Sequence, residues 1–259
     1  MVKGLYTAYT GMLNEQNRMD IMTNNLANAS TVGYKKEGST SQSFDDVLTV
    51  KIKDQSVGMR NVQRLGVKNP GVKIGENYTD YSQGSFRITG NTYDLALSGE
   101  GFFAIEFTNK AGETDTKYTR AGQFTLNKDG YLVTEEGDYV LDTQNRRIRL
   151  NTLIDSSITD DGTIYQNGQA VAKIQVTDFE DYDYLEKYGE TYYQPIQGAK
   201  TIAAKAQVKS GYLEMANVQI VSEMVNLISI TRAYESNQKV VQTIDDTLDV
   251  AVNQIGRVQ

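Results

Sequence analysis

Three groups of residues in this sequence have the types and spacing that binding or catalytic sites can use. The first group, Gly99, Gly101 and Ala104, fits the G-x-G-x-x-A pattern of dinucleotide-binding proteins. That pattern must open a helix, because the helix N-terminus holds the pyrophosphate. Here Phe-Phe-Ala-Ile-Glu-Phe follows the second glycine, which favours a strand. We therefore interpret the glycines as a tight turn between two strands and predict no dinucleotide site.

The second group resembles a calcium loop. Thr125, Asn127, Asp129, Gly130 and Glu136 stand at positions one, three, five, six and twelve of such a loop. Thr is a poor substitute for the Asp expected at the first position, and no helical pattern flanks the segment. A hairpin turn is the preferred interpretation, and a small calcium-binding module around Asp129 is the alternative.

The third group consists of close carboxylates in residues 160–161 and 178–183. Paired carboxylates can hydrolyse glycosidic bonds. On the exposed turns of an acidic protein they are more often solvated charge, and we interpret both groups in that way.

The composition argues against an enzyme. The 259 residues include no His and no Cys, which removes the commonest general base, the commonest metal ligand and thiolate chemistry. We therefore predict no catalytic residue, no metal, no cofactor and no small-molecule substrate.

The charge argues against nucleic acid as a partner. The formal net charge is -7, and basic residues form no long run. Lys35 and Lys36 stand as a lone pair, which we interpret as a solvated turn. The sequence also lacks the ~18 consecutive apolar residues of a membrane helix, and its N-terminus lacks the apolar run of a secretory signal.

Hydrophobic periodicity predicts an α+β fold, with a helix near each end and an all-β middle. Helices are expected over residues 5–26 and 215–255. Frequent Gly, Asn and Asp turns between short apolar segments indicate the β-rich part, with hairpin turns at 127–130 and 167–168. The expected domains are a terminal helical domain made by residues 1–33 and 212–259, an extended connector with strand pieces at 34–80, and a β-rich domain at 81–211.

Both predicted helices carry apolar residues at alternating spacings of three and four. This heptad pattern is typical of helices that pack on other helices, so the two are expected to pair with each other and with further chains. The residues predicted to pack between subunits are Leu5, Tyr9, Met12, Met19, Leu26, Ile220, Met224, Leu227, Tyr234, Val241, Leu248 and Val252.

The C-terminal helix carries more than one seam. Thr231, Gln238 and Asp245 stand seven apart in the first seam. Burying an unbonded polar side chain costs ~1–3 kcal/mol, so these three are expected to bond to neighbouring chains or to face water. Because such a helix is ~60 Å long, a tube of many chains fits better than a helix hairpin covered by the β-rich domain. The second apolar row consists of Val218, Val221, Val225, Ile228, Val240, Ile244 and Ala251.

Four blocks of this sequence resemble one family, the axial proteins of the bacterial flagellum, which form its rod and hook. Residues 24–36 are similar to the pattern N-N-[IL]-A-N-x-x-T-x-G-[FY]-[KR], and residues 89–103 to T-G-x-x-x-D-[LV]-A-[IL]-x-G-x-G-[FW]-[FL]. Residues 118–124 resemble Y-T-R-x-G-x-[FL], and residues 217–235 resemble the closing helix signature of the family. The residues carried over from these patterns are Asn24, Asn25, Ala27, Asn28, Gly33, Asp94, Gly99, Gly101, Phe102, Asn217, Glu223, Arg232 and Tyr234.

The resemblance implies a structural subunit of the flagellar basal-body rod, most like the distal rod protein, with a proximal-rod or hook-type paralogue as the alternative. Such subunits are expected to pair their terminal helices as a coiled coil and to polymerise into a helical tube that transmits torque from motor to hook. The implied partners are further copies of the chain and other rod and hook proteins. The resemblance also implies type III export through the flagellum, without a cleaved signal peptide.

A function of another class stays open from the residues alone, namely an oligomeric stalk that carries a glycan-binding β domain. It is motivated by the acidic, Tyr-rich segment from Tyr182 to Tyr193, and residues 178–190 are expected to form an excursion on the surface of the β-rich domain. For an isolated chain the sequence predicts protease trimming to a core of roughly residues 35–210, because amphipathic terminal helices without partners are unstable.

Overall fold

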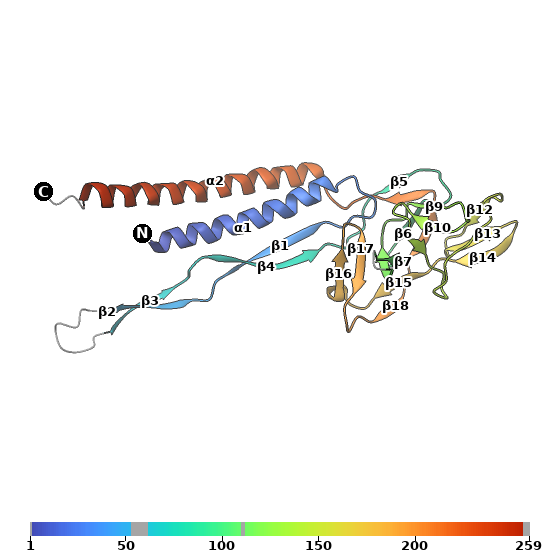
Figure 1. The fold of residues 1–259 in the computed structure, drawn as a ribbon, viewed down its shortest axis with the longest axis horizontal. Coiled ribbons are helices and arrows are strands. Elements are labelled where there is room, and N and C mark those ends of the chain that lie inside the picture. The colour runs from blue at the N-terminus through green and yellow to red at the C-terminus, as the bar shows by residue number, and fades with distance from the viewer. Residues whose placement is uncertain (1, 53–61, 110–111, 256–259) are drawn as a thin grey trace. The chain divides into compact units, whose positions relative to one another are not determined.

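The computed structural model describes residues 2–52, 62–109 and 112–255 of the chain (Figure 1). A helix at each end and a mostly β middle confirm the predicted α+β class. None of the helices in these ranges is long and apolar enough to cross a membrane. The elements, in order, are α1 Val2–Ala27, β1 Glu37–Ser43, β2 Val47–Ile52, β3 Val62–Lys68, β4 Val72–Thr79, β5 Phe86–Ile88, β6 Leu95–Ser98, β7 Phe102–Thr108, β8 Thr114–Thr119, β9 Phe124–Leu126, β10 Leu132–Thr134, β11 Tyr139–Val140, β12 Ser156–Ile158, β13 Thr163–Gln166, β14 Gln169–Lys173, β15 Val176–Phe179, η1 Tyr182–Tyr184, β16 Leu185–Tyr188, β17 Tyr192–Pro195, β18 Thr201–Ala203, β19 Gln207–Ser210, β20 Tyr212–Glu214, α2 Ile220–Val250 and η2 Ala251–Ile255.

The chain divides into two compact units. The helical unit contains residues 1–26, 37–80 and 220–259, and the β unit contains residues 27–36 and 81–219. Residues 27–36, expected in the helical domain and the connector, thus group with the β unit, and residues 37–80 group with the helices.

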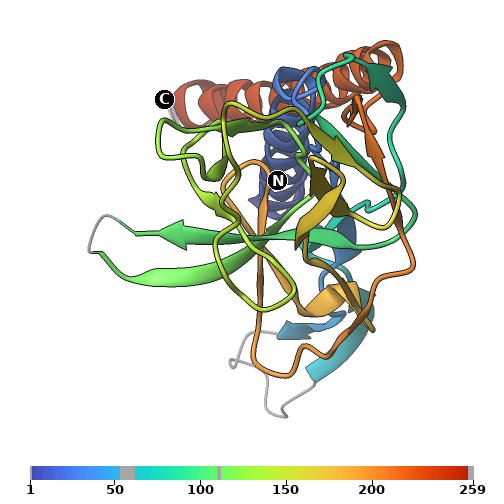
Figure 2. The ribbon, with the colours of Figure 1, turned by 90° about the vertical axis from the view of Figure 1, so that its right-hand side faces the viewer.

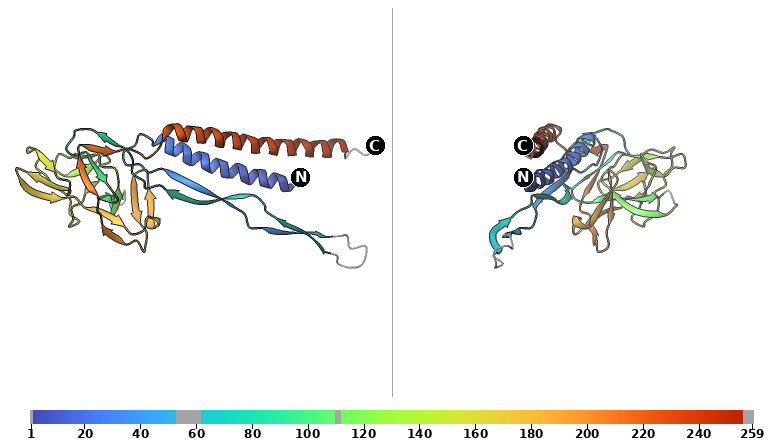
Figure 3. Two further views of the ribbon diagram at one scale, coloured as in Figure 1. Left: turned by 180° about the vertical axis from the view of Figure 1, so that it is seen from behind. Right: turned by 60° about the vertical axis from the view of Figure 1, so that its left-hand side comes forward.

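In the helical unit, α1 and α2 lie side by side and run antiparallel (Figures 1 and 3). A Cβ atom added at Gly4 would lie 3.5 Å from Ile244 Cδ1, and one added at Gly11 would lie 3.0 Å from Asn237 Nδ2. Gly4 and Gly11 are seven residues apart, as are Ile244 and Asn237, and the numbers rise on α1 while they fall on α2. This is the register of an antiparallel pair. Glycine costs helix stability. At Gly11 it leaves room for the Asn237 side chain, whereas at Gly4 an added Cβ would make only an ordinary contact with Ile244.

The start of α2 differs from the sequence-based expectation. The helix begins at Ile220 rather than at residue 215. Met215 instead forms a β-bridge with Val32, and the Asn217 side chain accepts a hydrogen bond from the Lys36 N–H at 2.8 Å. These contacts hold the chain extended, so α2 spans 31 residues, or roughly 47 Å, and Val218 of the second apolar row stands outside it.

Residues 37–52 and 62–80, expected as part of a connector with strand pieces, form a two-stranded ribbon in which β1 pairs with β4 and β2 with β3. The ribbon runs along α1. Thr7 Oγ1 donates a hydrogen bond to the Pro70 carbonyl at 3.1 Å, and Ser41 Oγ donates to Asn14 Oδ1 at 3.1 Å.

The β unit is built on a sheet with strand order β16-β17-β8-β7-β11-β10-β9, to which β15 and β18 add beside β7. The long β7–β8 hairpin, green in Figure 2, crosses this unit. One apolar cluster forms around Leu97, Phe103 and Phe124. A second is aromatic and includes Phe102, Tyr118, Phe179 and Tyr193.

The two hairpin turns predicted from Asn, Asp and Gly residues are confirmed. Strands β9 and β10 pair around residues 127–130, and β13 and β14 pair around Asn167 and Gly168, both of which have positive φ. Gly99 and Gly101, also with positive φ, connect β6 to β7. A strand rather than a helix follows, as predicted.

Most residues of the predicted surface excursion, 178–190, are exposed, with Tyr184 at 45% and Tyr188 at 43%, but the tyrosines that follow it are not. Tyr192 and Tyr193 are buried, and Tyr182 packs on Phe102 with ring centroids 5.9 Å apart. Asp178, expected as solvated charge, is buried and accepts a hydrogen bond from Tyr182 Oη at 2.8 Å. Tyr192 and Tyr193 thus belong to the core and cannot stack on a sugar, whereas Tyr184 and Tyr188 remain on the surface.

Candidate functional site: an apolar helix surface and a buried ion cluster

The outward side of α2 carries a contiguous apolar surface in its first turns. The spacing places Ile220, Val221, Met224, Val225 and Ile228 together on one side of the helix, because residues four apart lie one turn apart. All five are exposed, with Val221 at 77% and Val225 at 61%. We call these five residues the α2 patch.

A second exposed apolar surface lies on α1 and the ribbon. Tyr6, Tyr9 and Leu13 are exposed at spacings of three and four on α1. A hollow of about 290 Å³ opens beside Tyr6 and is lined also by Val47, Thr49, Lys68 and Pro70. We call Tyr6, Tyr9, Leu13 and this hollow the α1 surface.

The residues predicted to pack between subunits fall into two groups. Ile220 and Met224 on α2, Val252 in η2 and Tyr9 on α1 are exposed. The other predicted residues are half-buried: Leu5, Met12, Met19, Leu26, Leu227, Tyr234, Val241 and Leu248. The predicted seam therefore does not lie on one face, because part of it faces α1 within the chain and part faces outward.

The three polar seam residues have different surroundings. Thr231 is half-buried, and its hydroxyl donates to the Leu227 carbonyl of the same helix at 2.8 Å. Gln238 and Asp245 are exposed.

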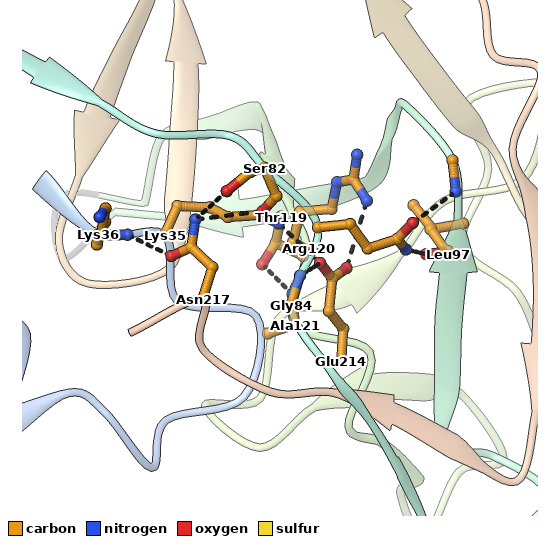
Figure 4. A network of polar contacts seen from close by, with 12 residues as sticks. Lys35, Lys36, Ser82, Gly84, Leu97, Thr119, Arg120, Ala121, Glu214 and Asn217 are labelled. Carbon is orange, nitrogen blue, oxygen red and sulfur yellow. Dashed lines mark hydrogen bonds and ion pairs between the residues drawn. The ribbon is translucent and has the colours of Figure 1, made fainter. Parts of the chain in front are cut away.

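A buried ion cluster lies in the β unit (Figure 4). Lys35 Nζ is 2.7 Å from Glu214 Oε1, and Arg120 Nη1 is 3.3 Å from Glu214 Oε2. The Gly84 N–H also donates to Glu214 Oε1 at 3.0 Å, and Lys35 Nζ donates to the Ser82 carbonyl at 2.8 Å. Glu214 is fully buried and Lys35 is 1% exposed. The interpretation of Lys35 as part of a solvated turn is therefore wrong.

Backbone contacts surround the cluster. The Gly33 N–H donates to the Glu214 carbonyl at 2.8 Å, and Gly33 has φ of 70°. A Cβ at this position would lie 2.3 Å from the Ala121 backbone nitrogen. Only glycine therefore fits here without moving the backbone.

A surface ion pair is found on the β sheet of the same unit. Arg147 donates to both carboxylate oxygens of Glu106, at 2.7 and 3.0 Å. The hydrogen bond from Arg147 holds the pKa of the Glu106 carboxyl below its ordinary value, although partial burial opposes this shift. Burial raises the pKa of the Tyr192 hydroxyl, and its hydrogen bond to Asp138 adds to the shift.

The candidate calcium loop is a hairpin turn in which the Asn127 side-chain oxygen already accepts hydrogen bonds from the backbone. Asn127 Oδ1 accepts hydrogen bonds from the N–H groups of Asp129 and Tyr131, at 3.0 and 2.8 Å. Within the described ranges no group of His, Cys, Asp and Glu is arranged to hold a metal ion.

Comparison with known proteins decides the family. Three family models match this chain: flagella basal body rod protein at residues 5–35, flagellar hook protein FlgE/F/G D1 domain at 96–168, and flagellar basal body rod FlgEFG protein C-terminal at 209–255. The flagellar basal-body rod protein FlgG of Bacillus subtilis (strain 168) is 34% identical, and the match covers 98% of this chain and 99% of that protein. The chain belongs to the flagellar basal-body rod protein family. It is a structural protein of the basal body, in a family that is not one of enzymes.

Other relatives in the family have different names. The flagellar basal-body rod protein FlgF of Caulobacter vibrioides is 32% identical, and the flagellar hook-basal body complex protein FlhO of Bacillus subtilis (strain 168) is 30% identical. Both matches cover 100% of this chain and 100% of the relative. The FlgG-named and FlgF-named relatives are similar to this rod protein at nearly the same level.

In this rod protein the N-terminal motif residues bind the backbone that follows α1. The Asn25 side chain donates to the Glu37 carbonyl at 2.7 Å and accepts from the Glu37 N–H at 2.9 Å, so it pairs as a strand would. Asn28 Oδ1 accepts from Thr31 Oγ1 at 3.1 Å, while Asn24 and Ala27 are exposed.

The middle motif residues shape the β unit. The Asp94 carbonyl accepts from the Gly211 N–H at 2.8 Å, and its carboxylate accepts from Asn91 Nδ2 at 3.2 Å. Phe102, after the two glycines, packs in the aromatic core.

The C-terminal motif residues divide between the two units. Asn217 in the β unit binds the Lys36 N–H and donates to the Ser82 hydroxyl at 3.0 Å. In the helical unit, Glu223 is buried, Tyr234 is half-buried and Arg232 is exposed.

Sequence reasoning missed Glu214 as a key residue. Lys35 and Arg120 stood inside the quoted motifs, but Glu214 lies between two of them. The available signal was a charged residue at the end of a short strand, beside the apolar Leu213 and Met215.

Proposed function

We propose that this rod protein polymerises into a helical tube that transmits torque from motor to hook. The observation that carries the proposal is the exposed α2 patch. A monomeric protein rarely exposes a large contiguous apolar surface, and such surfaces mark interfaces. In a family of rod subunits, the natural occupants are further copies and other rod and hook proteins.

The terminal segments, residues 1–33 and 212–259, are proposed as the polymerisation domain, in which α1 and α2 pair as a coiled coil with helices of other subunits. The ribbon within residues 37–80, expected as part of the connector at 34–80, groups with these helices, and the β-rich domain contains residues 81–211. Export through the flagellum without a cleaved signal peptide belongs to the same proposal, which the absence of cysteine supports. The distal-rod type is our first choice, and the proximal-rod paralogue is the alternative.

A charge in the α2 patch tests the proposal. Val225→Asp places a carboxylate in an exposed position, so the fold of the single chain is expected to survive. Ser229→Asp, one turn later and also exposed, adds the same charge beyond the patch and serves as the control. We expect Val225→Asp to abolish rod assembly and swimming while circular dichroism stays unchanged. A Val225→Asp strain that swims with intact rods would refute the proposal.

A further inference from the structure

The turn between β13 and β14 contains Asn167 and Gly168, and Asn167 is the only asparagine in this sequence that is followed by glycine. Gln166 and Gln169 pair across the turn, so Asn167 and Gly168 are its two central residues. Their φ angles are 50° and 75°, as a type I′ turn requires. Both residues are exposed, and nothing lies within 4 Å of a Cβ atom built on Gly168. The outer side of the turn is therefore open to water.

An asparagine followed by glycine in such a turn can lose its side-chain amide. The Gly168 backbone nitrogen gives up its proton to hydroxide and attacks the Asn167 Cγ atom, and the side-chain nitrogen leaves as ammonia. Water then opens the resulting succinimide ring at either carbonyl. One product is aspartate, and the other is isoaspartate, in which the main chain continues through the former side-chain carbonyl. Glycine favours the attack, because no Cβ shields its nitrogen and its backbone rotates freely.

Other asparagines in turns of the β unit lack one of these features. Asn145 is also exposed and has a φ of 55°, but Arg146 follows it. Asn127 is held in place, because its side-chain oxygen accepts hydrogen bonds from two backbone N–H groups at 3.0 and 2.8 Å. Asn145 therefore matches Asn167 in backbone conformation and exposure and differs from it in the residue that follows.

Gln166, beside the turn, determines what isoaspartate would change in the fold. Gln166 is buried, and its side-chain nitrogen donates to the carbonyl groups of Asn151 at 2.9 Å and Ile154 at 3.3 Å. Its side-chain oxygen accepts from the Asn151 N–H at 3.1 Å. Isoaspartate adds a methylene group to the main chain of the turn, and loop length fixes the register of a hairpin. A longer turn therefore displaces Gln166 and weakens its hold on residues 151–154.

We propose that Asn167 is a modification site of this protein, at which spontaneous deamidation produces isoaspartate and loosens residues 151–154 through Gln166. The reaction consumes water, releases ammonia and leaves a carboxylate in place of the amide, and it needs no further reactant. This inference goes beyond the proposed polymerisation and does not depend on it.

Ageing of the purified full-length protein tests the site. The protein is kept for weeks in neutral buffer at physiological temperature and is then digested at acidic pH, which suppresses the reaction. Mass spectrometry with electron-transfer fragmentation distinguishes isoaspartate from aspartate. We expect the Asn167 peptide to convert mainly to isoaspartate, several-fold faster than the Asn145 peptide, and faster as the pH rises because the nitrogen must lose its proton.

The matched variant is Gly168→Asn, because asparagine tolerates positive φ but shields the nitrogen with a side chain. We expect most of the conversion at Asn167 to be lost in this variant. Equal conversion at Asn167 and Asn145, or undiminished conversion in Gly168→Asn, would overturn the site. Conversion that occurs only in urea-unfolded protein would mean that the folded turn protects Asn167 and would also overturn it.

Hydrogen exchange measured by mass spectrometry tests the role of Gln166. The amides of residues 151–154 should exchange faster in converted protein than in fresh protein. Freshly prepared Asn167→Asp adds the charge without lengthening the main chain, so its exchange should equal that of fresh protein. Unchanged exchange in converted protein, or an equal increase in Asn167→Asp, would overturn the role given to Gln166.

Discussion

Lys35 Nζ lies 2.7 Å from Glu214 Oε1, although 179 residues separate them in sequence. This ion pair, with Arg120 on the other carboxylate oxygen, joins the segment that follows α1 to the segment that precedes α2. Both segments are thereby fixed within the β unit. In this chain, the family motif at residues 24–36 provides Lys35 and Gly33, which both bind Glu214.

Removal of the Glu214 charge should strongly destabilise the β unit. Glu214→Gln leaves Lys35 and Arg120 buried without the carboxylate, and breaking a buried pair from one side costs about 3–5 kcal/mol. The control, Glu180→Gln, breaks an exposed pair with Lys200, where a loss below about 1 kcal/mol is expected. Urea unfolding of the full chain measures both. Equal losses in the two variants would show that the buried cluster has no special role.

Gly33→Ala should destabilise the chain more than Gly90→Ala does. Both glycines have φ near 70°, so both substitutions carry backbone strain of about 1 kcal/mol. Nothing lies within 4 Å of a Cβ at Gly90, but at Gly33 the Ala121 nitrogen would lie 2.3 Å away. Melting temperatures of the two variants separate the effects, because Gly90→Ala introduces backbone strain alone and Gly33→Ala adds a steric clash with Ala121. A Gly33→Ala variant as stable as Gly90→Ala would contradict the close contact.

The Glu106–Arg147 pair should contribute to acid sensitivity. The pKa of Glu106 is lower in the folded chain than its ordinary value. At a pH between these two values, the folded state therefore binds fewer protons than the unfolded state. The stabilisation is therefore complete above the ordinary pKa and is lost as the pH falls through the lowered value. Because Arg147 is partly exposed, we expect a contribution of about 0.5–1 kcal/mol.

Glu106→Gln measures this contribution. Its free energy of unfolding should fall below that of the native chain at pH 7, and the two should converge towards pH 2. Glu113→Gln, at an exposed position, is the control. A difference that stays constant over this pH range would show that the pair has no linkage to protons.

Limited proteolysis of the full-length monomer should leave a core larger than residues 35–210. That range lacks Gly33, Glu214 and Asn217, whose contacts belong to the β unit. We expect a resistant fragment that begins before Val32 and ends after Asn217, because cleavage inside the cluster requires the β unit to open. Mass spectrometry gives the ends of the fragment. Cleavage between residues 28 and 36, ahead of cuts in α1 and α2, would contradict this boundary.

The sequence predicted those features well that depend on residues adjacent in the chain, such as tight turns. The turns at residues 127–130 and at Asn167–Gly168 depend on residues next to each other, and both form as expected. The start of α2, the burial of Lys35 and the packing of Tyr193 depend on partners far along the chain. A local sequence pattern contains no information on such distant partners. The apolar periodicity therefore placed the start of the second helix five residues too early, at residue 215 instead of Ile220. The predicted seam mixed residues that face α1 with residues that face outward, because both faces of α2 are apolar.

The most direct test of assembly is electron cryomicroscopy of tubes formed by the purified, full-length protein, with helical reconstruction. We expect tubes in which the α2 patch is buried against neighbouring copies. Tubes in which these residues face solvent, or a protein that stays monomeric at high concentration, would contradict the account.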